Sequence, residues 1–326
     1  MVKMMTMPAL HVGQGATAGP LTVFPVWAAE PGPAGLATGL AADVRVGERD
    51  GRPVVGQLVL TNTGSAPALL VEGELLEGGW QHRVLLHDLV LAPGRSMVAP
   101  VACVEAGRWG GGGQHARRAR RASGAVRATL HTTSPSMRQG EVWRRVSGYD
   151  TAMGASATSS FLDHLDAFDS DRAAPSLDSR RPPAPGGPAA GPSPAEVDGW
   201  LREVRAVAPL DGQRGVVVGV AGQPVLLEVF PSSQALTEAL PALLTGLLLD
   251  AVAAGAPVEP TPARRARRIV ERLDGERFHR QEGVDAGLGV PQTLDTRSLA
   301  ARGVAVDEVW AHLSVFNRTH PLLAAA

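Results

Sequence analysis

Residues 169–194 constrain the fold of this 326-residue chain more than any other segment. They read DSDRAAPSLDSRRPPAPGGPAAGPSP, in which Leu177 is the only large apolar residue. A segment of this composition buries too little apolar surface to offset the entropy that a chain loses on folding. We therefore expect a disordered linker over residues 169–195 that separates two folded parts.

The part before this linker is rich in short apolar runs separated by turn residues. The clearest runs lie at 21–27, 54–76 and 82–107. Glycine, proline and serine interrupt them about every ten residues, a pattern typical of antiparallel strands. We expect a β-sandwich-like, β-rich domain over residues 21–168, closed by two helices at 134–146 and 156–168, and a flexible N-terminus over residues 1–20.

The part after the linker, residues 196–326, combines strands with a long apolar helix. The segment GVVVGVAGQPVLLEVF predicts two strands around a tight turn. The leucines of the next segment, 232–254, cover nearly all faces of a helix, and a helix that is apolar on all faces is buried. The expected class is α+β, with strands packed on a long buried helix. We expect this part to pack with the first as one unit.

Composition excludes several classes of function. The formal net charge is −1, which disfavours binding to nucleic acid or to a membrane surface. Lys3 is the sole lysine, so a Schiff-base lysine and a Walker-type phosphate loop are both excluded. The histidines lack metal-ligand spacing, and we expect no metal and no cofactor. A single cysteine and the absence of an N-terminal signal sequence predict a cytoplasmic protein.

The stretch VACVEAGRWGGGGQHARRARRASG, residues 101–124, invites three chemical interpretations. Cys103 could be a nucleophile, but free cysteines are among the most buried residues, and we expect a buried thiol. The glycines at 110–113 lack the lysine of a phosphate cradle and predict a flexible loop. The arginines at 117–121 are expected to form a solvated basic loop.

Five polar residues form a more informative pattern, namely Glu74, Gln81, Arg83, Glu105 and Arg108. A planar guanidinium beside carboxylates and an amide can bind phosphate or sugar hydroxyls. The same groups can also simply pair with one another, Glu74 or Glu105 with Arg83 or Arg108. Taken alone, the residues favour this structural pairing, since ion-pair networks are often only structural.

These residues also carry a resemblance to a known family. The chain shows Leu21-x-x-Phe24-Pro25, then Gly73-Glu74, then Gln81-x-Arg83, then Cys103-x-Glu105-x-x-Arg108-Trp109. This order resembles a bacterial family, the ADP-ribosylglycohydrolase- and rhodanese-phosphatase-superfamily-associated protein domain family. The similarity covers most of the chain outside the linker. His82 departs from the family pattern at the position between the glutamine and the arginine.

The resemblance implies a connection with ADP-ribose or a related NAD-derived nucleotide. On that basis Glu74 and Glu105 become candidate general bases, and Arg83 and Arg108 candidate stabilisers of negative charge. The remaining candidates are expected to bind ligand, namely Gln81, His82 and Trp109. If the protein is an enzyme, we expect a hydrolase.

The partners implied by the resemblance are a nucleotide-like small molecule and an ADP-ribosyl hydrolase. The alternative is a non-catalytic protein-interaction module, in which the Glu/Arg cluster is a structural ion-pair network. An open pocket around the cluster favours the first hypothesis, and a sealed network favours the second.

Overall fold

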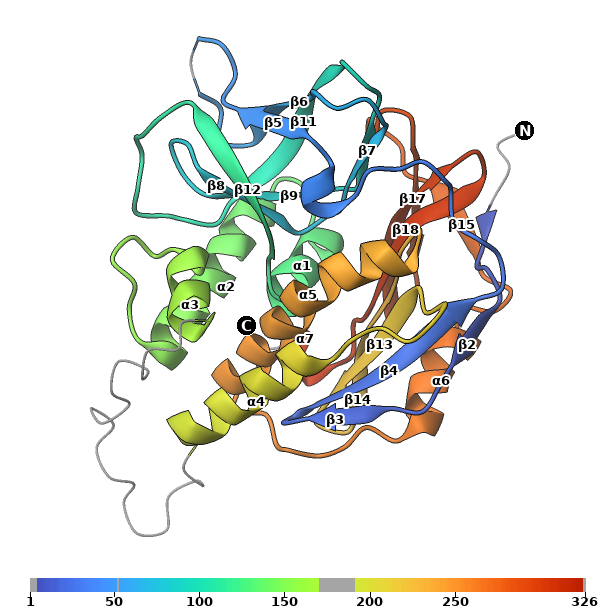
Figure 1. The fold of residues 1–326 in the computed structure, drawn as a ribbon. Helices are drawn as coiled ribbons and strands as arrows, with labels where there is room; N and C mark the ends of the chain where they lie inside the picture. Colours follow the sequence, from blue (N-terminus) through green and yellow to red (C-terminus); the bar gives the residue numbers. More distant parts are fainter. Residues whose placement is uncertain (1–4, 52, 170–190, 325–326) are drawn as a thin grey trace.

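The computed structural model describes residues 5–51, 53–169 and 191–324. A large open β-sheet and a smaller closed β-barrel lie on either side of a group of helices (Figure 1). The paired strands of both β-structures are antiparallel, which confirms the expected α+β class. The expected linker falls almost entirely on residues 170–190, which lie outside the described residues.

The large sheet joins the two ends of the chain. It has ten strands in the order β1-β15-β16-β17-β18-β14-β13-β4-β2, with β3 also paired to β4. Their bounds are β1 Met5–Thr6, β2 Leu10–Val12, β3 Ala16–Ala18, β4 Leu21–Ala28, β13 Gly215–Val220, β14 Gln223–Val229, β15 Arg277–Arg280, β16 Val290–Asp295, β17 Leu299–Val306 and β18 Val309–Asn317. A flexible N-terminus was expected over residues 1–20, but the described part of this segment forms three short strands, β1, β2 and β3. Strand β1 pairs with β15 at one edge of the sheet, and β2 and β3 both pair with β4 at the other.

The strands between residues 44 and 121 close into a barrel instead of stacking as two sheets. The barrel order is β11-β6-β5-β12-β8-β9, and β7 and β10 form a separate two-stranded sheet. Their bounds are β5 Val44–Gly47, β6 Gln57–Asn62, β7 Ala68–Leu70, β8 Glu74–Gly78, β9 Arg83–Leu85, β10 Leu89–Leu91, β11 Ser96–Cys103 and β12 Gln114–Arg121. Buried leucines and valines fill the interior of the barrel.

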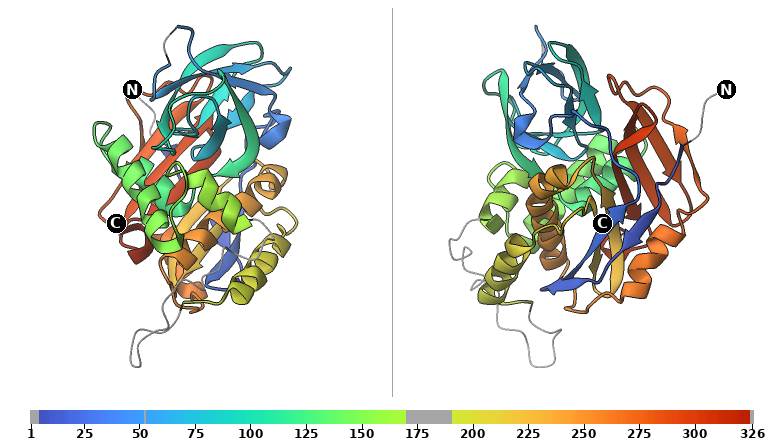
Figure 2. Two further views of the ribbon diagram at one scale, coloured as in Figure 1. Left: turned by 90° about the vertical axis from the view of Figure 1, so that its left-hand side faces the viewer. Right: turned by 45° about the vertical axis from the view of Figure 1, so that its right-hand side comes forward.

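Helices α1 and α5 lie between the barrel and the sheet, whereas α6 packs on the opposite face of the sheet (Figures 1 and 2). The bounds of the helices are η1 Gly39–Ala41, α1 Gly124–Thr132, α2 Arg138–Met153, α3 Phe161–Asp169, α4 Pro194–Ala206, α5 Ser233–Ala253, α6 Ala263–Glu271 and α7 Pro321–Ala324. Among the described residues, α5 alone is long and apolar enough to cross a membrane, and 67 % of that stretch is buried inside the protein. This confirms the expected long buried helix, which Ser232 caps by accepting a hydrogen bond from the Ala235 amide at 3.1 Å.

The arginine run is the clearest departure from expectation. The solvated loop predicted over residues 117–121 is wrong, since these residues end strand β12. Arg117 and Arg120 form ion pairs with carboxylates of β8, and Arg121 points into the protein core, where it is 3 % exposed. The carboxylates across the barrel therefore determine the strand, because a buried carboxylate requires a cation beside it.

Candidate functional site

Glu105 is the centre of the predicted polar cluster. It follows β11 and is 2 % exposed. The Arg108 guanidinium donates to both of its oxygens, from Nε to Oε1 at 2.8 Å and from Nη2 to Oε2 at 2.7 Å. The backbone amide of His82 donates to Oε2 at 3.0 Å, and the Thr158 hydroxyl donates to Oε1 at 2.9 Å. Both oxygens of this carboxylate therefore accept two hydrogen bonds.

These donors decide the charge of Glu105. Burial raises the pKa of Glu105. The hydrogen bonds from Arg108 and from the His82 amide act in the opposite direction, and the resulting pKa lies below the usual value. The hydrogen bond to Glu105 in turn raises the pKa of Arg108. Arg108 also donates to the carbonyl of Gly79 at 2.8 Å. The result is a closed, charge-assisted pair that fixes the turn after β11 against the β8–β9 turn.

Gln81 and Arg83 extend this cluster toward the inside of the barrel. The Gln81 amide donates to the Glu105 carbonyl at 2.9 Å, and the Arg83 Nη1 donates to the Gln81 Oε1 at 3.1 Å. Arg83 is fully buried, and burial lowers its pKa. Among the described residues its Nε and Nη2 atoms have no hydrogen-bond partner.

Cys103 lies beside this group as a buried thiol. Its Sγ donates to the Glu105 carbonyl at 2.9 Å. Burial raises the pKa of the thiol, and the thiolate that a nucleophile requires is therefore disfavoured. The geometry agrees with the expected structural thiol and gives no support to a nucleophile.

Glu74 does not join the other predicted residues. It begins β8, and its Oε1 accepts a hydrogen bond from the Nε of Arg117 at 2.6 Å. Arg117 also donates to the carbonyl of Gly39 at 2.9 Å. The expected pairing of Glu74 with Arg83 or Arg108 is absent from the ion pairs of the described residues, because β12 supplies a nearer arginine.

Two predicted ligand-binding residues lie nearer the surface. Trp109 is 52 % exposed, and its ring meets that of Trp80 edge-on with centroids 5.4 Å apart. The His82 ring accepts a hydrogen bond from the Gly78 amide at 2.9 Å and lies 3.7 Å from Glu105 Oε2. Burial lowers the pKa of His82, which favours the neutral ring.

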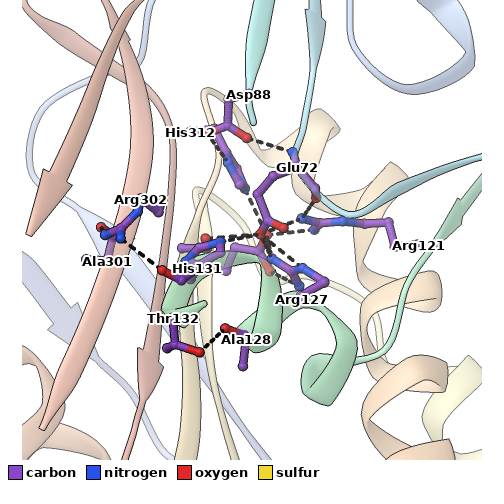
Figure 3. Close-up of polar contacts among 12 residues, drawn as sticks. Glu72, Asp88, Arg121, Arg127, Ala128, His131, Thr132, Ala301, Arg302 and His312 are labelled. Atoms are coloured by element: carbon purple, nitrogen blue, oxygen red, sulfur yellow. Dashed lines mark hydrogen bonds and ion pairs between the residues drawn. The ribbon is translucent and has the colours of Figure 1, made fainter. Parts of the chain in front are cut away.

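A second polar network, which the sequence patterns did not reveal, is buried in the protein core (Figure 3). Its centre is Arg127 on α1, which is 1 % exposed. This arginine donates to the carboxylates of Glu72 and Glu228, with Nε–Oε1 at 3.0 Å to Glu72 and Nη2–Oε1 at 2.9 Å to Glu228. The other members are Asp88, Arg121, His312 and Ser314.

Charges in this network balance one another. Burial raises the pKa of Glu228, but Arg121, Arg127 and His312 together lower it by more, and Glu228 is ionised. Burial lowers the pKa of His312, yet Asp88 and Glu228 raise it to about 9. The described residues hold no group of three or more His, Cys, Asp or Glu side chains placed to bind a metal ion.

The network reaches an open cleft through His131, at the end of α1. The His131 Nε2 lies 3.5 Å from Glu72 Oε1, and its backbone carbonyl accepts a hydrogen bond from Arg302 Nη2 at 3.0 Å (Figure 3). The cleft beyond has a volume of about 430 Å³. Its charged and titratable lining comprises His87, His131, Arg138, Asp295, Arg302 and Arg318.

Comparison with known proteins gives one match. The family described as ARG and Rhodanese-Phosphatase-superfamily-associated Protein domain matches residues 9–181 and 200–316. No curated protein and no solved structure is significantly similar to the chain. The family takes its description from an association with ADP-ribosylglycohydrolases, abbreviated ARG, and with the rhodanese-phosphatase superfamily. Because the match covers most of the chain, this protein belongs to the ARG and rhodanese-phosphatase-superfamily-associated protein domain family.

Proposed function

We propose that this protein is a non-catalytic interaction module that works beside an ADP-ribosyl hydrolase, with its Glu/Arg cluster serving a structural role. The observation that carries this proposal is that both carboxylate oxygens of Glu105 already accept hydrogen bonds from protein groups. Its buried carboxylate accepts hydrogen bonds from Arg108, the His82 amide and Thr158. A general base must offer a free lone pair to a water molecule within hydrogen-bond reach.

The second candidate base is engaged as well. Glu74 is buried and bonded to Arg117, which also holds the chain at Gly39. The pKa of Glu105 lies below its usual value, whereas a carboxyl that acts as a general acid near neutral pH requires a raised pKa. The family association supplies the choice of partner, because it connects such chains with ADP-ribosylglycohydrolases.

Variants of the Glu105–Arg108 pair test this proposal. Glu105→Gln leaves Arg108 without its charged partner, and loss of one member of a buried pair costs about 3–5 kcal/mol. We expect a loss near 3 kcal/mol in urea unfolding, because the Arg108 side chain is still 29 % exposed. The matched control is Glu141→Gln, which breaks the exposed Glu141–Arg144 pair and should change the free energy of unfolding little.

Turnover of an ADP-ribosylated peptide should be measured on the same variants. The proposal predicts no hydrolysis by the wild-type chain alone at any protein concentration that keeps it folded. Hydrolysis by the wild type that Glu105→Gln abolishes, with melting close to that of the wild type, would contradict the proposal.

A second candidate function is binding of an ADP-ribose-like nucleotide beside the same cluster. The observation in its favour is the exposed Trp109, whose sequence neighbour is Arg108. Arg108 would bind the diphosphate and Trp109 would stack on the base. A thermal shift with ADP-ribose should then weaken in Arg108→Ala and in Trp109→Ala. No shift at millimolar ADP-ribose would exclude this candidate.

A further inference from the structure

The cleft at His131 is lined by several arginines and is separate from the Glu105 cluster. Five separate parts of the chain line it, namely the β9–β10 turn, the segment from the end of α1 to the start of α2, the residue after β15, β16 with β17, and the residue after β18. Arg138 begins α2, Arg302 comes from β17, and Arg318 follows β18. Residues far apart in the sequence thus place three guanidinium groups around one space.

A single carboxylate in the cleft lining faces these arginines. Asp295 Oδ2 lies 2.9 Å from Arg302 Nη2, and its Oδ1 lies 3.5 Å from Arg318 Nη1. In the part of the chain that the structure describes, no carboxylate forms an ion pair with Arg138. Three positive charges against one negative charge leave the cleft electropositive.

Hydrogen-bonding groups in the cleft also lack partners. The Nε of Arg138 is buried and has no hydrogen-bond partner among the described residues, and its Nη2 reaches the Thr133 carbonyl only at 3.4 Å. The same holds for the Nδ1 of His131, a residue that is 6 % exposed. An unpaired buried polar group destabilises the protein, so a ligand that forms hydrogen bonds with such groups gains affinity.

The pKa shifts of His87 and Arg138 agree with an excess of positive charge in the cleft. Burial and then the charge of Arg138 lower the pKa of His87 to about 4. Burial and then the charge of Arg302 lower the pKa of Arg138. Each group experiences surplus positive charge, which an anion in the cleft would neutralise.

We propose that the cleft bounded by Arg138, Arg302 and Arg318 binds a phosphate-bearing ligand, either a phosphate monoester or a diphosphate. The two uncompensated positive charges match the charge of a phosphate monoester, about −1.5 to −2 at pH 7. Guanidinium groups bind phosphate oxygens through parallel N–H donors. A phosphate group has more oxygens than a carboxylate and can therefore accept hydrogen bonds from more of these donors. The neutral rings of His87 and His131 add N–H donors without adding charge.

Titration calorimetry of the full chain with inorganic pyrophosphate tests this site. The ionic strength is held constant with chloride, because surface charge effects depend on salt. We expect Arg138→Gln and Arg318→Gln each to weaken binding by about tenfold or more, since a hydrogen bond to a charged group contributes about 1.5–3 kcal/mol. Arg264→Gln is the matched control, because this exposed arginine lies on α6, outside the cleft.

Folding of the variants is checked by their melting without ligand. Arg318 is exposed, and its removal leaves the core unchanged, so at least one variant remains informative. ADP-ribose in a parallel titration identifies the source of the phosphate. Tighter binding than pyrophosphate indicates a nucleotide, and equal binding indicates a bare diphosphate. No binding of either probe at millimolar concentration, or equal binding by Arg138→Gln and Arg264→Gln, would overturn the proposal.

Discussion

Replacing Arg127 by methionine should destabilise the protein more than replacing any exposed arginine. Arg127 joins the barrel side of the molecule, through Glu72, to the sheet side, through Glu228 (Figure 3). Methionine has a similar length but no charge, so Arg127→Met leaves two buried carboxylates with less compensation. Arg121 remains beside Glu228, with Nη1 2.6 Å from Oε1, but it lies 3.6 Å from Glu72.

The magnitude follows from burial. Both carboxylates are 1 % exposed or less, and removal of one partner from a buried ion pair costs about 3–5 kcal/mol. The control is Arg144→Met, because the Arg144 side chain is 45 % exposed and pairs with Glu141 at the surface. An exposed pair contributes about 0–1 kcal/mol. The expected difference between the two variants is therefore about 3 kcal/mol.

Urea unfolding followed by circular dichroism measures both variants. A double variant, Arg127→Met with Glu72→Gln, should recover part of the loss because one uncompensated charge is removed. If Arg127→Met and Arg144→Met lose the same free energy of unfolding, the network does not hold the barrel to the sheet, and the reasoning is refuted.

Three further predictions concern titration and reactivity. His312, with its pKa raised from 6.5 to about 9, contributes stability that is fully present below pH 6.5 and is lost as the pH rises to 9; His312→Gln should flatten this loss in pH-dependent urea unfolding. Burial raises the pKa of Asp250 from 3.8 to about 6, so stability should fall across that interval as the unfolded carboxyl ionises first, and the difference between wild type and Asp250→Asn should show it. Cys103 should react with iodoacetamide at pH 7 more slowly than free cysteine, and mass spectrometry of the folded protein would reveal faster labelling.

Local patterns in the sequence predicted the elements that local forces determine. The leucine-rich segment 232–254 forms the long buried helix α5, as expected. The tight turn expected within GVVVGVAGQPVLLEVF lies at Ala221 and Gly222, between β13 and β14, and both residues have positive φ angles. Phe161 and Phe168 fall on the buried face of α3. Each of these features depends on residues within a few positions of one another.

Long-range pairing could not be predicted in the same way. Closure of the barrel requires β11 to pair with both β6 and β9, which spacing along the chain does not reveal. The arginines at 117–121 looked solvated because their carboxylate partners lie far away in the sequence, about forty residues earlier for Arg117 and about a hundred residues later for Arg121. Tertiary pairing made this segment a strand.

The buried network had one usable signal in the sequence. Glu228 is the one charged residue in the apolar run VLLEV, and His312 and Ser314 are the polar residues of the apolar run VWAHLSVF. A charged residue in such a position is rarely fully buried unless it is paired. That signal identifies the residues but not their partners, since Arg127 lies on a helix about a hundred positions away.

Hydrogen exchange at the His82 backbone amide tests most directly whether Glu105 is closed to water and ligand. The amide lies between β8 and β9, and its hydrogen-bond acceptor is the Glu105 carboxylate. We predict exchange that approaches the rate of global unfolding in the wild type, and much faster exchange in Glu105→Gln. Exchange in the wild type as fast as in an exposed loop amide would mean that Glu105 is free to act as a base, and would contradict the structural role proposed for the Glu/Arg cluster.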